Sequence, residues 1–306
     1  MGSPVSLART KNVSGNLKDV VSRALAEIDF KAPDSVETVV IKPNLCYYWN
    51  SSTGNTTDPK VVAGIIDYFR DVYGENTRIS VVEADASAMR TKYAFPVLGY
   101  TRLAEKKKVH LTNLSEEELA ETTVTVDGQN LTFKIPQLLL KSDLFINVPK
   151  LKVMRDPIIT CAMKNLFGAN GVKRKNRYHK FLSEAIVGIN KILHPHVTIV
   201  DGIFALGSHP IRLDLVMAGT DPFSVDWVAS QAMGFEPLKI PFLKLAIKEK
   251  VGSIEGIKIL GEKPTSIGRI FPKPSVSTKY VWRLRFAMLK AYKRLSGDVV
   301  PPVLEE

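Results

Sequence analysis

The segment VETVVIKPN, residues 36–44, decides the fold class because its apolar run is continuous rather than alternating. Such a run is typical of a strand buried on both faces in a parallel sheet. A helix is expected next over Pro59–Tyr73, with Asp58 as its cap and proline at its first position. A second strand, RISVVE, follows at Arg78–Glu83. This order predicts an α/β fold with a mainly parallel sheet and helices on both faces.

Further periodic segments extend this pattern in both directions. Asp127-Gly128 lies between two alternating runs and predicts a β-hairpin excursion from the sheet. The other expected strands cover residues 143–148, 197–200, 215–219 and 254–260, and the other expected helices cover residues 16–28 and 181–193 and the segment after Asp221. Asp221 precedes a proline, as Asp58 does, so both are predicted to be helix caps.

Composition sets the limits for the function. The 306 residues carry a net charge of +11, which favours acidic partners such as anionic small molecules, nucleic acid or an anionic membrane. There are only two cysteines, so no iron–sulfur cluster is expected within this chain, and a reducing, cytoplasmic location is predicted. We divide the chain into an N-terminal helix and lead-in (1–34), an α/β domain (35–265) and a basic, aromatic C-terminal extension (266–306) with a helix over residues 279–295.

The segment IITCAMKNLFGANGVKRKNRYHK, residues 158–180, is predicted to meet an anion. Its apolar start fits a helix, and Gly168 and Gly171 permit positive φ, which would turn backbone N–H groups toward a ligand. Lys173 to Lys180 then form a basic cluster without an acidic residue. The alternative is a helix that ends at glycine and leads into a solvated basic loop.

Polar residues gather where the expected strands end, and in parallel α/β sheets ligands bind beyond these carboxyl ends. We therefore predict a common anion site whose substrate-binding residues are Lys42, Asn44, Lys150, Lys152, Asn165 and Asn170. The predicted catalytic residues are Lys164, Asp201 and His209. Lysines there would neutralise charge that develops at a phosphate or carboxylate.

Three carboxylates supply the oxygen ligands that a hard cation prefers. Glu83, Asp85 and Asp226 are the candidate metal ligands, with Mg²⁺ as the expected ion. Signatures of other enzyme classes are missing, because the sequence has no G-x-G-x-x-G, G-x-S-x-G, H-E-x-x-H or complete phosphate-binding loop. His194 and His196 flank a proline in a turn, so we interpret them as structural.

Six short motifs in sequence order resemble the uncharacterised family called domain of unknown function 362, over roughly residues 38–262. They are IKPNL (41–45), TTDP (56–59), VPKLK (148–152), MKNLFG (163–168), IVDG (199–202) and DPFSVD (221–226). The resemblance implies no established reaction. Relatives often have histidine where this chain has Asp58, and again shortly after the lysine pair, where it has Val153-Met154. If those histidines bind a metal in relatives, the resemblance implies that the site is altered or lost here.

The leading hypothesis is an enzyme or ligand-binding protein that acts on a phosphate- or carboxylate-bearing small molecule, with a transferase- or ligase-like reaction if it is an enzyme. One alternative is a nucleic-acid or polyanion binder that uses the basic cluster and the C-terminal helix. The other is a protein that docks on a membrane surface through that helix. The sequence gives no oligomeric state.

Overall fold

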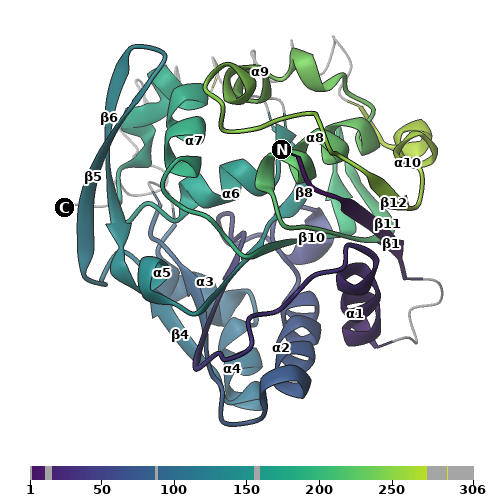
Figure 1. Cartoon of the computed structure of the whole chain (residues 1–306). Coiled ribbons are helices and arrows are strands. Elements are labelled where there is room, and N and C mark those ends of the chain that lie inside the picture. The colour runs from purple at the N-terminus through teal and green to yellow at the C-terminus, as the bar shows by residue number, and fades with distance from the viewer. Residues whose placement is uncertain (1, 11–15, 87–88, 155–158, 274–287, 289–306) are drawn as a thin grey trace.

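A computed structural model describes residues 2–10, 16–86, 89–154, 159–273 and 288. The predicted C-terminal helix over residues 279–295 lies outside the described residues except for Met288. Figure 1 shows one mixed sheet through the centre of the molecule. Its strand order is β12-β1-β11-β10-β7-β2-β3-β4, and β8 and β9 extend it beside β10. Within the described residues, no helix is both long and apolar enough to cross a bilayer.

The sheet is parallel through its centre and antiparallel on one side. Strands β10, β7, β2, β3 and β4 run parallel, whereas β11 pairs antiparallel with both β10 and β1. The strands are β1 Val5–Arg9, β2 Thr38–Pro43, β3 Arg78–Glu83, β4 His110–Asn113, β7 Leu144–Val148, β8 Lys150–Val153, β9 Ile159–Thr160, β10 Val197–Leu206, β11 Pro210–Gly219 and β12 Ile259–Gly261. This confirms the predicted mainly parallel α/β fold. The N-terminal segment, predicted as a lead-in, contributes β1 to the sheet.

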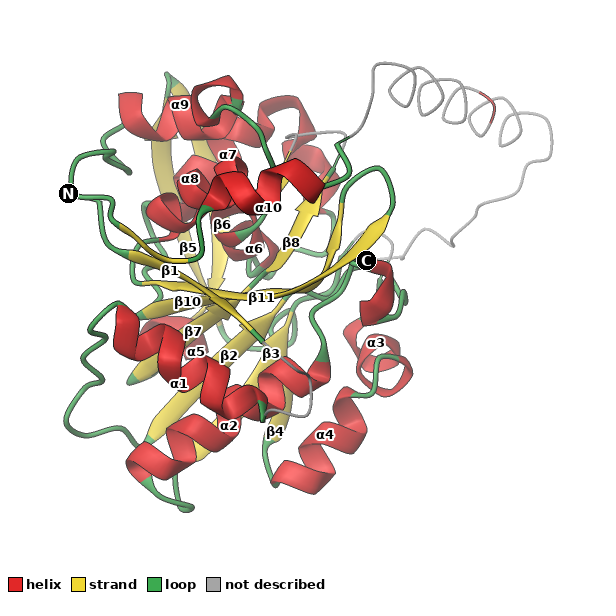
Figure 2. Cartoon of the chain, turned by 90° about the vertical axis from the view of Figure 1, so that its right-hand side faces the viewer, coloured by secondary structure: helices red, strands yellow, loops and turns green. Residues whose placement is uncertain are grey.

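Helices cover both faces of the sheet, as Figure 2 shows from the side. Helices α1 to α4 pack on one face and α6 to α9 on the other. The helices are α1 Leu17–Glu27, α2 Pro59–Tyr73, α3 Thr91–Val97, α4 Tyr100–Lys107, α5 Gln137–Lys141, α6 Ala162–Gly168, α7 Leu182–Asn190, α8 Pro222–Ala232, α9 Pro241–Lys248 and α10 Pro264–Ile270. Successive strand residues alternate between the two cores: Val39 and Ile41 face one, and Val40 faces the other.

Aspartate caps set where the helices α2 and α8 begin. The Asp58 side chain accepts a hydrogen bond from Lys60 N at 2.8 Å, and α2 starts at Pro59. Asp221 accepts from Phe223 N and Ser224 N at the start of α8. Both predicted caps are confirmed. They satisfy N–H groups that the first helical turn leaves without partners.

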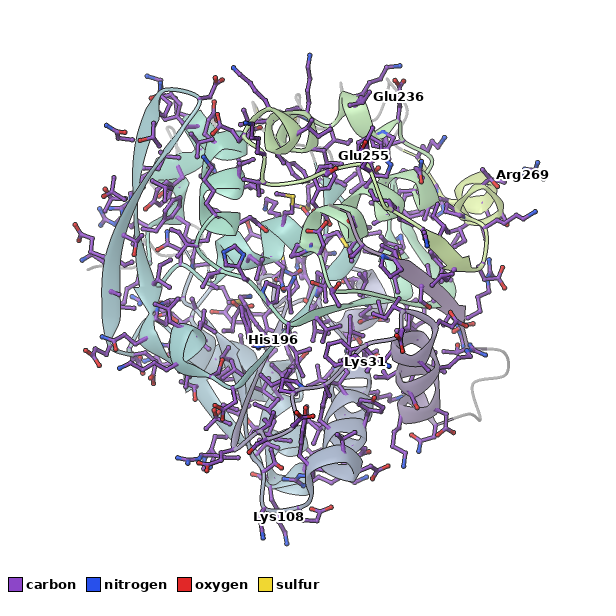
Figure 3. All side chains as sticks on the ribbon, viewed as in Figure 1. Lys31, Lys108, His196, Glu236, Glu255 and Arg269 are labelled. Carbon is purple, nitrogen blue, oxygen red and sulfur yellow. The ribbon has the colours of Figure 1, made fainter. Side chains whose placement is uncertain are left out.

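The hairpin of β5 Leu119–Val126 and β6 Gln129–Pro136 turns at Asp127 and Gly128, both with positive φ, as predicted. It forms its own two-stranded sheet and packs against α7. Charged side chains such as Lys108, Glu236 and Arg269 project from the periphery of the molecule (Figure 3).

Two expectations for the segment after β8 are wrong. Ile159 and Thr160 form β9 against β8, and α6 begins only at Ala162, because the backbone of Cys161 is not helical, with φ −155° and ψ −126°. Gly168 and Gly171 do not have positive φ. At both glycines, a side chain from another part of the chain instead approaches the backbone closely. A Cβ at Gly171 would come within 2.6 Å of the Leu119 side chain, and one at Gly168 would lie 3.4 Å from Lys42 Nζ.

Candidate functional site

Lys42 lies at the carboxyl end of β2 and is fully buried. Its Nζ forms an ion pair with Glu83 Oε1 at 2.8 Å, and Glu83 ends the neighbouring parallel strand β3. Glu83 also accepts hydrogen bonds from Leu45 N and Ala84 N, each at 3.0 Å. A buried lysine is tolerated when a carboxylate neutralises it and the remaining lone pairs are satisfied. This pair is therefore complete without a ligand.

A second buried ion pair joins Lys150 of β8 to Asp201 of β10. Lys150 Nζ lies 2.8 Å from Asp201 Oδ2, and both side chains have no exposed surface. The same Oδ2 accepts from Asp58 N at 2.7 Å, and Oδ1 accepts from Ile203 N at 3.0 Å. Asp201 was predicted to be catalytic. In the structure it balances Lys150 and joins β10 to the start of α2.

Asparagines connect the lysines into one polar network. Asn165 Oδ1 accepts from Lys42 Nζ at 3.3 Å and from Asn44 Nδ2 at 3.2 Å. Asn44 Oδ1 in turn accepts from Lys152 Nζ at 2.7 Å. The Asn165 amide is fixed from its other side, because its Nδ2 donates to Lys42 O and to Asn147 Oδ1. Five of the six predicted substrate-binding residues (Lys42, Asn44, Lys150, Lys152 and Asn165) thus come together at one edge of the sheet.

Lys152 is buried but forms no ion pair with a carboxylate in the part of the chain that the structure describes. Its Nζ donates to Asn44 Oδ1 and to Asn55 O, each at 2.7 Å. Burial lowers the pKa of Lys152, since the charged form is disfavoured away from water, while the neighbouring Cys46 thiol acts in the opposite direction.

Lys164, on the first turn of α6, is half-buried and has neither a hydrogen bond nor an ion pair with any residue that the structure describes. Burial, reinforced by the like charge of Lys152, lowers the pKa of Lys164 to about 8. The free protein therefore holds this ammonium group without a counter-charge, close to another lysine. With a pKa of about 8 the side chain can also accept or donate a proton near neutral pH.

Lys175 joins the same group from the basic cluster, although it was not predicted as a site residue. It is buried, and its Nζ donates to the backbone carbonyl of Asp85. Burial lowers the pKa of Lys175 to about 8, with Glu83 and Lys42 as its nearest charged influences. The following turn is held by Tyr178, whose ring stacks on Phe133 of the hairpin at 5.4 Å. The hairpin thus positions Lys175.

We call these five residues, Lys42, Lys150, Lys152, Lys164 and Lys175, the lysine cluster. Two of them are neutralised by Glu83 and Asp201, and three have no carboxylate partner among the described residues. Each unpaired charge keeps a positive potential that water screens poorly. The cluster therefore has an excess of positive charge suited to a small anion.

The predicted metal site has no support. In the part of the chain that the structure describes, no three His, Cys, Asp or Glu side chains come together as a cation would require. Asp85 accepts from Thr91 N and pairs with Arg90 at 3.0 Å. Asp226 is not grouped with Glu83 and Asp85. Its oxygens accept hydrogen bonds from Ala162 N and Met163 N at the start of α6. Burial raises the pKa of Asp226 to about 7, despite those two donors.

Two other predicted site residues are not joined to the lysine cluster by any described contact. His209 is exposed at the turn between β10 and β11, where its Nδ1 lies 3.2 Å from Ser208 Oγ. Asn170 anchors the hairpin, since its Oδ1 accepts from Lys134 N at 3.2 Å. His196, predicted to be structural, accepts a hydrogen bond from Phe145 N at 3.0 Å. This confirms that interpretation.

Sequence reasoning missed three groups in the site. Asn147 lies at the end of β7, paired in register with Lys42, so the strand-end rule that selected Lys42 could have found it. Asn55 contributes only a backbone carbonyl, which no residue type reveals. Lys175 had no local signal, because its burial depends on the hairpin, which lies some forty residues earlier in the chain.

Comparison with known proteins gives a family but no activity. A family described as a domain of unknown function, DUF362, matches residues 39–231. A thylakoid-associated protein, sll1697, of Synechocystis sp. is 30% identical over 230 residues, which cover 71% of this chain and 68% of that protein. The lactate racemase apoprotein of Thermoanaerobacterium thermosaccharolyticum is 12% identical with a TM-score of 0.39, and the match covers 71% of this chain and 54% of the racemase.

Proposed function

The chain belongs to the DUF362 family, and we propose that it binds a phosphate- or carboxylate-bearing small molecule at the lysine cluster. One observation carries the proposal: Lys152, Lys164 and Lys175 are buried or half-buried, and none of them forms an ion pair with a carboxylate among the residues that the structure describes. An uncompensated buried charge costs folding free energy. An anionic ligand would remove that cost, and the gain would appear as binding affinity.

The neighbouring groups support a ligand with oxygen acceptors. Lysine ammonium groups are point charges with three donors each, and they suit phosphate or carboxylate oxygens without fixing one geometry. Asn44 and Asn165 hold Lys42 and Lys152 in place through their amide oxygens. The cations are therefore preorganised, which reduces the entropy lost when a ligand binds.

Lys164 is the residue that we assign to chemistry at the bound anion. Unlike Lys42 and Lys150, its ammonium group has no partner among the described residues, and its pKa of about 8 lets it exist in both protonation states near neutral pH. A transferase- or ligase-like reaction at a phosphate or carboxylate needs such a group for proton transfer and for charge stabilisation.

Calorimetric titration with inorganic phosphate, pyrophosphate and oxalate tests the proposal. We expect binding that persists at physiological ionic strength and weakens at least about tenfold in Lys164→Met, since a charge-assisted contact contributes roughly 1.5–3 kcal/mol. Lys248→Met, which removes an exposed lysine on α9, is the matched control and should bind as the wild type does. Unchanged affinity in Lys164→Met, or no binding of any of the three anions, would contradict the proposal.

The polyanion alternative makes a different prediction for the same protein. Binding through the exposed basic residues would favour duplex DNA over phosphate and would weaken steeply with salt. It would also be insensitive to Lys164→Met, because that residue is half-buried. Parallel titrations with a short DNA duplex at two salt concentrations therefore separate the two functions.

A further inference from the structure

Five large apolar or aromatic side chains are exposed in two neighbouring segments. Tyr47, Tyr48 and Trp49 follow β2 and are 42%, 39% and 51% exposed, and Tyr93 and Val97 on α3 are 55% and 64% exposed. We call these five residues the aromatic face. Large apolar side chains gathered in this way on the surface of a soluble domain mark a site of interaction.

The two segments are in contact. Tyr48 Oη accepts a hydrogen bond from Arg90 N at 3.0 Å, and α3 begins at the next residue. Tyr93 and Val97 are four residues apart and therefore lie on one side of that helix. Within the loop, the rings of Tyr47 and Trp49 pack at 5.0 Å. The face is thus one surface built from the loop after β2 and the exposed side of α3.

A basic group borders this surface. Lys92 is exposed, and its Nζ lies 4.8 Å from the centre of the Tyr93 ring. Tyrosine and tryptophan have an apolar body and a polar end, which suits the headgroup level of a bilayer. A lysine at the same level is attracted to anionic lipids. From these observations we infer that the aromatic face docks on the surface of an anionic bilayer.

The size of the face favours a bilayer over a protein partner. Five side chains, each about half exposed, present roughly 400–500 Å² if a buried aromatic accounts for 150–250 Å². A stable protein interface needs about 800 Å² on each partner. Shallow insertion into headgroups needs only a few side chains, because apolar burial and attraction to anionic lipid add together.

Docking in this way would bring the lysine cluster near the lipid surface. Asn44 holds Lys152 within the cluster. Trp49 is five residues after Asn44, so Asn44 and Trp49 lie no more than about 17 Å apart along the chain. Membrane docking does not depend on the proposed anion binding. The two can fail separately, because one is measured with vesicles and the other with small anions.

Vesicle sedimentation tests the proposal with the full chain. We expect binding to vesicles of equal parts phosphatidylglycerol and phosphatidylcholine, much weaker binding to phosphatidylcholine alone, and a loss on the order of tenfold in the Trp49→Ser/Tyr93→Ser variant. Leu238→Ser is the control, because Leu238 is 53% exposed but belongs to a different element, the short helix Pro237–Lys239. Equal sedimentation of the wild type and the double variant would overturn the proposal.

A second measurement reports insertion directly. Brominated lipids quench tryptophan only at close range, so vesicles that contain them should reduce the emission of the wild type. When both proteins also carry Trp282→Phe, so that Trp227 is the one other tryptophan, the same vesicles should reduce the emission of Trp49→Phe far less, because Trp227 is partly buried and packs against Phe223 and the core. Equal quenching in both proteins would exclude Trp49 from the membrane contact. Urea unfolding midpoints that match the wild type would show that the exposed substitutions leave the fold intact.

Discussion

Lys150 and Lys164 lie in the same cluster but differ in how their charge is balanced. Lys150 is fully buried and paired with Asp201 at 2.8 Å, whereas Lys164 is half-buried and has no described partner. A buried cation with its own counter-ion is part of the scaffold. One without a counter-ion is available to a ligand. The comparison separates the residues that hold this edge of the sheet together from those on which the proposed anion binding depends.

Removing the paired lysine should have the largest effect. Lys150→Met leaves Asp201 buried without its cation, and we expect a loss of about 3–5 kcal/mol in the free energy of unfolding, because an isolated buried charge is expensive. Urea unfolding measures this loss. Lys164→Met should not lower the same free energy and should raise it at neutral pH, since it removes a desolvated charge that has no partner among the described residues.

A double substitution checks that the loss comes from the stranded carboxylate. Lys150→Met/Asp201→Leu should recover a large part of the stability, because it removes both charges. If Lys150→Met alone were as stable as the wild type, the distinction between scaffold and ligand-binding lysines would not hold.

The dependence of stability on pH gives a smaller effect. The folded pKa values of Lys164 and Lys175 are lowered from 10.5 to about 8. Between these values the unfolded chain binds more protons than the folded one, so this contribution makes the protein more stable as pH rises from about 8 to about 10. Urea unfolding across this range should show a steeper rise for the wild type than for Lys164→Met/Lys175→Met.

Phosphate should change that pH profile. A bound anion favours the charged lysines and raises their pKa, so saturating phosphate should flatten the rise in stability. Phosphate affinity itself should fall as pH increases through about 8, because the free protein then loses the positive charge. Parallel profiles for the wild type and the double variant would mean that these two lysines do not titrate as described.

The smallest effect is expected where an ion pair is exposed. Lys248 pairs with Asp127 at 2.6 Å, but the two side chains are 65% and 43% exposed. Water and salt screen such a pair, and most contribute little. Lys248→Ala should therefore unfold at the same urea concentration as the wild type. A clear shift would show that pairing alone, without burial, accounts for the stability assigned to Lys150.

Local patterns were sufficient for most of the sheet and for much of the site. Parallel strands end at one edge, so Lys42, Lys150 and Asp201 could be placed together from strand assignments alone. The same reasoning placed Glu83 there, although the structure pairs it with Lys42. What strand ends do not reveal is which charges cancel, because this depends on the direction and distance of side chains from separate strands.

The remaining differences come from long-range contacts. Val5–Arg9 is too short and too ordinary a segment to indicate a strand, and its partners lie more than 200 residues later. The delayed start of α6 depends on Asp226, whose oxygens accept from the first two N–H groups of that helix. In each case the deciding residue lies far away in the sequence.

The position of β1 between β11 and β12 also has a consequence for biosynthesis. Strand β1 precedes its partners β11 and β12 by more than 200 residues, so it is made well before Pro210–Gly219 and Ile259–Gly261. Its hydrogen-bonding edges must therefore stay unpaired during most of translation, a period in which exposed strands are prone to aggregate. The sheet can therefore close on this side only after residues 210–261 have been made.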